Sequence, residues 1–152
     1  MQDPDALTDL LLAAMRDNAD FVTIMGGDPA SIVAYHHEFP FRMNLANAID
    51  GMKAPAALLA YRSFRSSDRS GKLEHNFSLI LLPKAKIGTT LKALRQGVVA
   101  ASGSKFYCHQ PSNDTHPPDI LGGDFRAEFI GENQFIEYFE ATIRVTERGT
   151  DN

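Results

Sequence analysis

The stretch QFIEYFEATIRVTER, residues 134–148, decides the fold class. From residue 139 onward apolar and polar side chains alternate along it. The apolar series is Phe139, Ala141, Ile143 and Val145, and the polar series is Glu140, Thr142, Arg144 and Thr146. Successive side chains of a strand point to opposite faces of a sheet, so this alternation predicts a β-strand with one buried face. The rest of the chain must supply the layer that covers it.

Upstream segments predict the partner strands. Lys72–Leu82 alternates in the same way and ends at Pro83. Its apolar face consists of Leu73, His75, Phe77, Leu79 and Leu81. Ala56–Phe64 is apolar on both faces over its first half, which is typical of a central strand. The polar segment Ser66–Gly71 between them predicts a hairpin turn, and Phe125–Ile130 predicts a strand paired with the last one.

Two segments predict amphipathic helices. Asp3-Pro4 is a good helix start, because Asp caps and Pro tolerates the first helical position, so we expect a helix over Asp5–Asp17. A second helix is expected over Ile87–Ala101, capped by Thr89 or Thr90. Three shorter segments remain: Phe21–Met25 is expected in a strand region, Ala30–Tyr35 as a short strand or helical turn, and Phe106–His109 as a strand.

These elements predict one α+β domain over residues 1–152. Its centre is an antiparallel or mixed β-sheet with two main helices packed on one face. The chain length fits a single domain. Long loops are expected near residues 36–54 and 110–123, and loops of that length are often functional.

Composition excludes several classes of protein. The single cysteine, Cys108, cannot form an internal disulfide, so nothing indicates an oxidising compartment. The N-terminus lacks the features of a signal peptide, and no apolar run reaches the roughly 18 residues of a membrane span. The net charge of −4 disfavours general binding to nucleic-acid backbones.

Candidate chemistry is sparse. Adjacent histidines such as His36 and His37 point to different sides of an extended chain, so they are expected to be loop residues rather than zinc ligands. Cys108 and His109 are also sequence neighbours that face opposite ways on a strand, which opposes a thiol–imidazole pair. We therefore expect no catalytic, cofactor-binding or metal-binding residues. The alternative is a small cytosolic enzyme or ligand-binding domain that uses His36, His37, Cys108 or His109.

Charged residues offer a candidate interface. Basic side chains cluster around the hairpin between residues 62 and 72, and acidic ones gather near the last strand. The basic cluster is interpreted as a solvated hairpin tip, as a nucleic-acid platform with Tyr61 and Phe64, or as a contact between subunits. The candidate interface consists of Arg62, Arg65, Arg69, Glu132, Glu137 and Glu140. His75, on an apolar face, is expected to be a core or interface histidine with a hydrogen bond.

The order of these parts resembles the tail terminator and tail-completion (head–tail joining, neck) proteins of long-tailed bacteriophages. The resemblance lies in an N-terminal helix, an irregular stretch, a strand pair, a second helix and a final strand pair ending in residues 134–148. It implies a structural virion protein of a phage or prophage that forms a homo-oligomeric ring and contacts tail-tube or neck proteins. It also implies no catalysis, no cofactor, no specific nucleic-acid binding and no membrane, with residence in the host cytoplasm during assembly and then in the virion.

Overall fold

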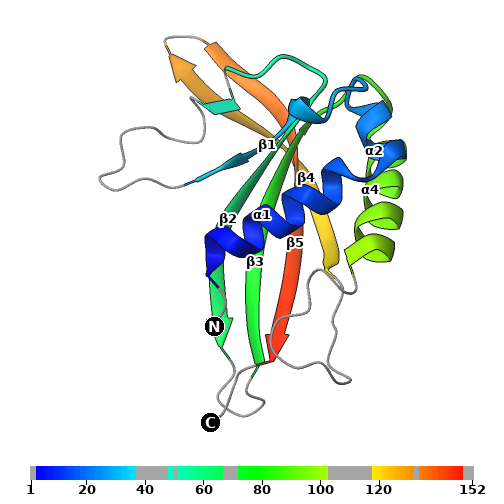
Figure 1. Cartoon of the computed structure of the whole chain (residues 1–152). Helices are drawn as coiled ribbons and strands as arrows, with labels where there is room; N and C mark the ends of the chain where they lie inside the picture. Colours follow the sequence, from blue (N-terminus) through cyan, green and yellow to red (C-terminus); the bar gives the residue numbers. More distant parts are fainter. Residues whose placement is uncertain are drawn as a thin grey trace.

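The computed structural model describes residues 3–36, 48–49, 51–66, 72–102, 118–131 and 134–148. The elements in chain order are α1 (Pro4–Arg16), α2 (Ala19–Ile24), η1 (Pro29–Ser31), β1 (Ile32–Tyr35), β2 (Ala56–Ser66), β3 (Lys72–Leu82), α4 (Ile87–Ser102), β4 (Asp119–Gly131) and β5 (Gln134–Arg148). The strands form one sheet in the order β1-β2-β3-β5-β4 (Figure 1). β1 runs parallel to β2, and the other neighbours are antiparallel. The predicted α+β class with a mixed sheet is confirmed.

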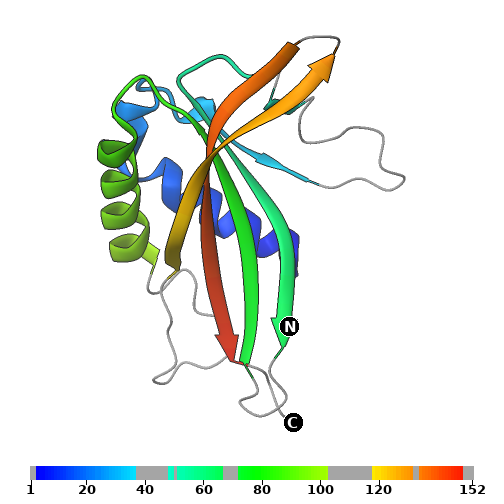
Figure 2. The same cartoon turned by 180° about the vertical axis from the view of Figure 1, so that it is seen from behind.

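The helices cover one face of this sheet, and none of the labelled helices lies on the opposite face (Figures 1 and 2). The main core lies between α1, α2, α4 and the sheet. Its sheet side includes Phe77, Leu79, Leu81, Phe139, Ala141, Ile143 and Val145, which alternate along β3 and β5 as the sequence predicts. Leu94 of α4 is fully buried against them. The apolar series that decided the fold class therefore forms the centre of the core.

A smaller apolar cluster lies on the opposite face. It consists of Ile49, Leu58, Ile80 and Tyr138. Leu58 and Ile80 are register partners in β2 and β3, so they point to the same side. The upper part of the sheet is therefore buried on both faces, which explains why the first half of β2 is apolar on both sides.

The start of α1 follows the sequence signal. The Asp3 carboxylate accepts a hydrogen bond from the Asp5 backbone N–H at 2.9 Å, and Pro4 occupies the first helical turn. This satisfies one of the backbone donors that a helix leaves unpaired at its N-terminus.

Removing this cap should weaken the helix measurably. We expect Asp3→Ala to lower the free energy of unfolding by about 1 kcal/mol, the usual loss for an N-cap acceptor. Urea unfolding followed by circular dichroism would measure the change. Asp3→Asn is the matched control, because it keeps an acceptor and should stay close to the wild type. An equal loss in both variants would contradict a capping role.

Four local predictions are wrong in part. Phe21–Met25 is not a strand: α2 occupies Ala19–Ile24, and Asn18 caps it by accepting from the N–H groups of Asp20 and Phe21. α4 begins at Ile87, before the expected caps. Thr90 is buried in the first turn, with its hydroxyl 3.4 Å from the Lys86 carbonyl. Its hydroxyl therefore bonds back along the helix instead of capping it.

The other two corrections concern strand limits. Ala30–Tyr35 resolves into η1 followed by β1, so both alternatives are partly right. The expected loop at 110–123 is wrong from Asp119 onward, because β4 already begins there. A register shift between Ile120 and Gly122 accommodates Gly122, whose φ is +150°. The expected strand at Phe106–His109 lies outside the described residues, as does most of the expected loop at 36–54.

Candidate functional site

The β4–β5 hairpin extends past the rest of the sheet. β3 pairs with β5 only as far as Leu81 opposite Phe139, whereas β4 and β5 stay paired to Gly131 opposite Gln134. Residues 134–138 of β5 are thus paired with β4 and no longer with β3. Figure 1 shows this end of the hairpin projecting beyond the helices at the top of the molecule. An isolated two-stranded ribbon is only marginally stable in water. A further contact would therefore stabilise this projection more than it would stabilise the rest of the sheet.

Three phenylalanines on this hairpin are largely exposed. The exposed fractions are 77% for Phe125, 78% for Phe129 and 56% for Phe135. Phe129 lies opposite Phe135, and Phe125 lies opposite Phe139, so all three are on the sheet face that the helices cover lower down. The ring centroids of Phe129 and Phe135 are 5.9 Å apart in an edge-to-face arrangement. We call Phe125, Phe129 and Phe135 the hairpin aromatic face.

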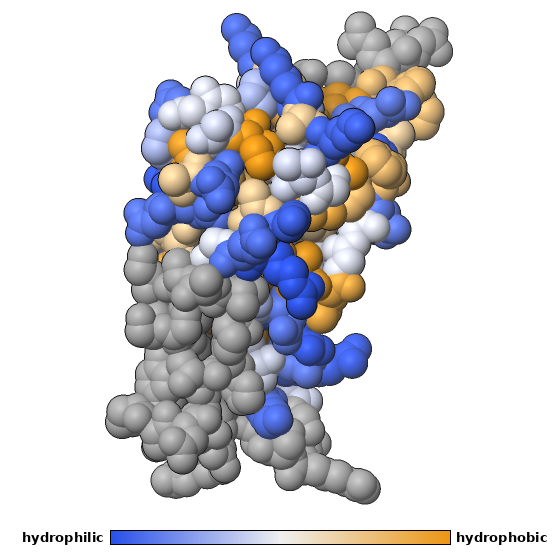
Figure 3. Space-filling view, turned by 90° about the vertical axis from the view of Figure 1, so that its right-hand side faces the viewer, coloured by the Kyte–Doolittle hydropathy of each residue, from blue (hydrophilic) through white to orange (hydrophobic). Residues whose placement is uncertain are grey.

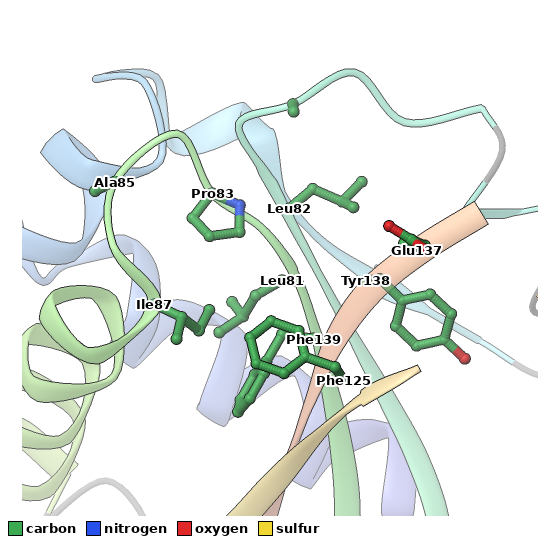
Figure 4. Close-up of a pocket in the computed structure, with 10 residues that line it drawn as sticks. Leu81, Leu82, Pro83, Ala85, Ile87, Phe125, Glu137, Tyr138 and Phe139 are labelled. Carbon is green, nitrogen blue, oxygen red and sulfur yellow. The ribbon is translucent and has the colours of Figure 1, made fainter. Parts of the chain in front are cut away.

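A pocket opens at the base of this face. It has a volume of about 390 Å³ and lies between β5, the base of the hairpin and the segment that joins β3 to α4 (Figure 4). Its walls are mainly apolar and include Leu81, Pro83, Ile87, Phe125 and Phe139, with Glu137 at one side. We call it the β3–α4 pocket. Phe125 belongs to both the pocket and the aromatic face, so the two surfaces share one residue.

Apolar surface is concentrated on this side of the molecule. Figure 3 shows hydrophobic residues gathered over the upper part of the side that carries α4 and β4, between hydrophilic ones. Isolated exposed apolar residues are ordinary on protein surfaces. Three exposed phenylalanines on one face of a hairpin, next to an apolar pocket, are different, because exposed apolar residues that gather in one place mark interaction sites.

The sheet face opposite the helices has a network of ion pairs. Glu140 lies 3.3 Å from Arg126 and 4.0 Å from Arg62, and its side chain is only 11% exposed. Farther along, Arg144 lies 3.3 Å from Asp119 and 3.8 Å from Glu74. The pairs of Arg126 with Glu140 and of Arg144 with Asp119 and Glu74 join neighbouring strands, whereas Arg62 of β2 reaches Glu140 of β5 across β3.

The structure describes four of the six predicted interface residues, and these four do not form one cluster. Arg62 and Glu140 pair within one chain, so neither needs a neighbouring subunit to meet an opposite charge. Arg65 is exposed on the far end of β2, opposite Glu74. Glu137 lies on the other face, beside the β3–α4 pocket. Arg69 and Glu132 lie outside the described residues.

The nucleic-acid platform considered for the basic hairpin is not formed by these residues. Tyr61 and Phe64 are register partners of Phe77 and His75, which point toward the helix side. Arg62 points to the opposite side, where it meets Glu140. Base stacking on aromatic rings needs both kinds of side chain along one groove, and here the sheet separates them.

The structure describes the surroundings of two histidines, His75 and His36. His75 is fully buried, and its Nδ1 lies 2.9 Å from the Tyr61 hydroxyl, which confirms the expected core histidine with a hydrogen bond. His36 is exposed, with Asp5 and Asp9 at 3.4 and 3.8 Å. His37, Cys108 and His109 lie outside the described residues. Among the residues that the structure describes, no group of three or more His, Cys, Asp or Glu side chains is placed to hold a metal ion.

No protein-family model matches the chain, and no curated protein is significantly similar to it in sequence. Within the described residues, no helix is long and apolar enough to cross a membrane. The feature that sequence reasoning missed is the hairpin aromatic face, although Phe125 and Phe129 are an even number of residues apart and therefore share a face of a strand.

Proposed function

We propose that this chain is a structural subunit that works by protein–protein contact and assembles with its own copies into a ring. The observation that supports this best is the hairpin aromatic face. Phe129 and Phe135 are 78% and 56% exposed on a hairpin that projects from a well-packed sheet. Aromatic side chains are enriched at protein–protein interfaces, where they lose their contact with water.

The more specific proposal follows from the resemblance to phage tail terminator and head–tail joining proteins. In this proposal the ring contacts tail-tube or neck proteins, first in the host cytoplasm and then in the virion. The net charge of −4 suits a ring through which DNA passes, since a strongly basic lumen would bind phosphate. The hairpin aromatic face and the β3–α4 pocket are two different surfaces, and a closed ring needs two on every subunit.

Self-assembly is the first test. We expect the purified full chain to elute as an oligomer whose mass by light scattering is a whole multiple of 16.7 kDa, and to appear as closed rings by negative-stain electron microscopy. The exposed phenylalanines provide the driving force, because apolar surface leaves water on contact. A monomer at every accessible concentration would contradict the ring.

A second candidate function is favoured by the β3–α4 pocket alone. A volume of about 390 Å³ with apolar walls lies within the range of small-molecule sites, about 300–1,000 Å³. The chain would then be a ligand-binding domain, although not one built on His36. A monomeric chain that binds a fluorescent apolar probe with one-to-one stoichiometry, and loses it on Ile87→Trp, would favour this alternative over the ring.

A further inference from the structure

Two apolar surfaces of this chain have opposite curvature. The hairpin aromatic face projects, and the β3–α4 pocket is hollow. Both are accessible in the described structure: Phe129 is 78% exposed, and the pocket opens to the surface beside Phe125. A projecting aromatic anchor that fills an apolar pocket is the usual composition of an interface hot spot.

Their charges are complementary. The hairpin segment 127–137 includes three glutamates and neither Lys nor Arg. The segment that joins β3 to α4 includes Lys84 and Lys86 and no acidic residue. Both lysines are exposed and flank Ala85, which lines the pocket. Glu137 also faces the pocket, from the hairpin side. Two hairpins would therefore repel each other. At the pocket Lys84 and Lys86 outnumber Glu137, so an incoming hairpin is attracted there.

The hairpin cannot fill its own pocket. Phe125 already forms part of the pocket wall, and Phe129 lies four residues farther along the same strand, about 13 Å away at the rise of an extended chain. β4 remains paired with β5 over this whole distance, so the hairpin does not fold back. The acidic hairpin that fits the pocket must come from another molecule, and a second copy supplies one in every assembly.

We propose that the β4–β5 hairpin of one copy docks in the β3–α4 pocket of the next, with Phe129 and Phe135 as its anchors and Lys84 and Lys86 at its rim. This inference rests on the proposed self-assembly and assigns its contact. In the ring each copy gives its hairpin to one neighbour and receives the hairpin of the other neighbour, so the contact is head-to-tail. The charges steer the hairpin toward the lysine rim, and the apolar anchors hold it.

Two variants separate the two surfaces. The hairpin variant, Phe129→Ala with Phe135→Ala, removes the anchors and leaves the pocket intact. The pocket variant, Ala85→Trp, fills the cavity from an exposed position and leaves the hairpin intact. Each should weaken self-association at least about 30-fold, the change expected for loss of a hot spot. All three positions are exposed, so the thermal midpoint of a dilute sample should stay near that of the wild type.

Matched controls lie at the other end of the sheet. Phe64 is another largely exposed phenylalanine, 54% exposed, and Phe64→Ala should assemble like the wild type. Lys84→Glu with Lys86→Glu should weaken assembly and reduce its sensitivity to salt, since exposed ion pairs are screened. Lys72→Glu, at the far end of β3, is the control for that change. Arg65→Glu tests whether the contact lies instead at the far end of β2.

Mixing the two variants gives the decisive measurement. The hairpin variant still has a working pocket, and the pocket variant still has a working hairpin. We expect each to be monomeric alone and the equimolar mixture to form a one-to-one heterodimer that grows no further, measured by light scattering with one copy carrying a mass tag. A mixture that stays monomeric would overturn the head-to-tail contact.

The remaining outcomes distinguish the two proposals. If both variants assemble like the wild type, or if only Arg65→Glu prevents assembly, the docking inference is wrong and the ring proposal stands. If the wild type itself is monomeric at every concentration, both fail. Loss of assembly in both variants with heterodimer formation in the mixture supports both.

Discussion

Phe77→Ala is expected to lower the free energy of unfolding by about 3–5 kcal/mol, the range for removing a large buried aromatic side chain. Phe77 is fully buried on β3, which is paired with β2 on one side and β5 on the other. The Tyr61 ring packs edge-on against it, with centroids 5.2 Å apart. Neighbours fixed by two strand ladders cannot move in to fill the space, so the cavity persists and the upper part of the range applies.

Phe64→Ala is the matched control for this prediction. It removes the same side chain from the same sheet face, but Phe64 is 54% exposed and should cost no more than about 0.5 kcal/mol. Urea unfolding midpoints with their slopes measure both changes. The samples must have one protein concentration, because self-association stabilises the folded state. Equal losses of unfolding free energy in the two variants would mean that Phe77 is not a core residue.

The central strands could be predicted because their pattern is local and periodic. Lys72–Leu82 is predicted with the bounds that β3 has in the structure. Its side chains alternate with a period of two residues and a proline follows it, and this combination predicts a strand and its end. The start of α1 is equally local, since Asp3 and Pro4 act on the backbone of the next few residues. Where the physical cause lies within one segment, the sequence is sufficient.

α2 could not be predicted because its cause is tertiary. Phe21–Met25 is a short apolar run, and such runs fit a strand and a buried helix equally well. The helix depends on Asn18, which caps it and also donates from its amide to the Ala93 carbonyl of α4 at 2.8 Å. That contact joins residues far apart in the sequence, and no local pattern indicates it.

The glycine pair in β4 is a similar case. Gly122 and Gly123 read as a loop because glycine is depleted in strands. In the structure, a Cβ at residue 123 would lie 2.6 Å from the Glu140 carbonyl oxygen and 2.6 Å from the Phe139 ring. Glycine is required at residue 123 by the close approach of β5, and the register shift between Ile120 and Gly122 is a bulge rather than the end of the strand.

The candidate site could not be predicted for a geometric reason. The sequence predicts an interface at the charged residues of the β2–β3 hairpin, but Arg62 pairs with Glu140 of the same chain. Phe129 and Phe135 belong to segments that the sequence predicts as paired strands. They are exposed because β3 stops pairing with β5 at Phe139, while β4 and β5 continue. The sequence of a hairpin does not predict where the strand next to it ends.

Gly97→Ala is expected to lower the free energy of unfolding by about 2 kcal/mol, although glycine-to-alanine changes inside helices usually stabilise by about 1 kcal/mol. A Cβ at residue 97 of α4 would overlap the side-chain amide of Asn18 and lie 2.7 Å from its Cβ. Asn18 would have to leave, breaking its bond to the Ala93 carbonyl and the cap of α2. Overpacking at about 1–3 kcal/mol and loss of a cap at about 1 kcal/mol together exceed the gain in helix propensity.

Two further variants test that explanation. Gly88→Ala is the control within α4, because no atom lies within 4 Å of its added Cβ, and it should stabilise by roughly 0.4–1 kcal/mol. Asn18→Gly removes the obstructing side chain, and glycine at an N-cap costs only a few tenths of a kcal/mol relative to Asn. In that background Gly97→Ala should no longer destabilise, since helix propensity is then the largest remaining effect. The unfolding midpoints of the wild type, Asn18→Gly, Gly97→Ala and the double variant form a double-mutant cycle that measures this dependence. A loss of the same size in both backgrounds would show that Gly97 is required by a neighbour other than Asn18.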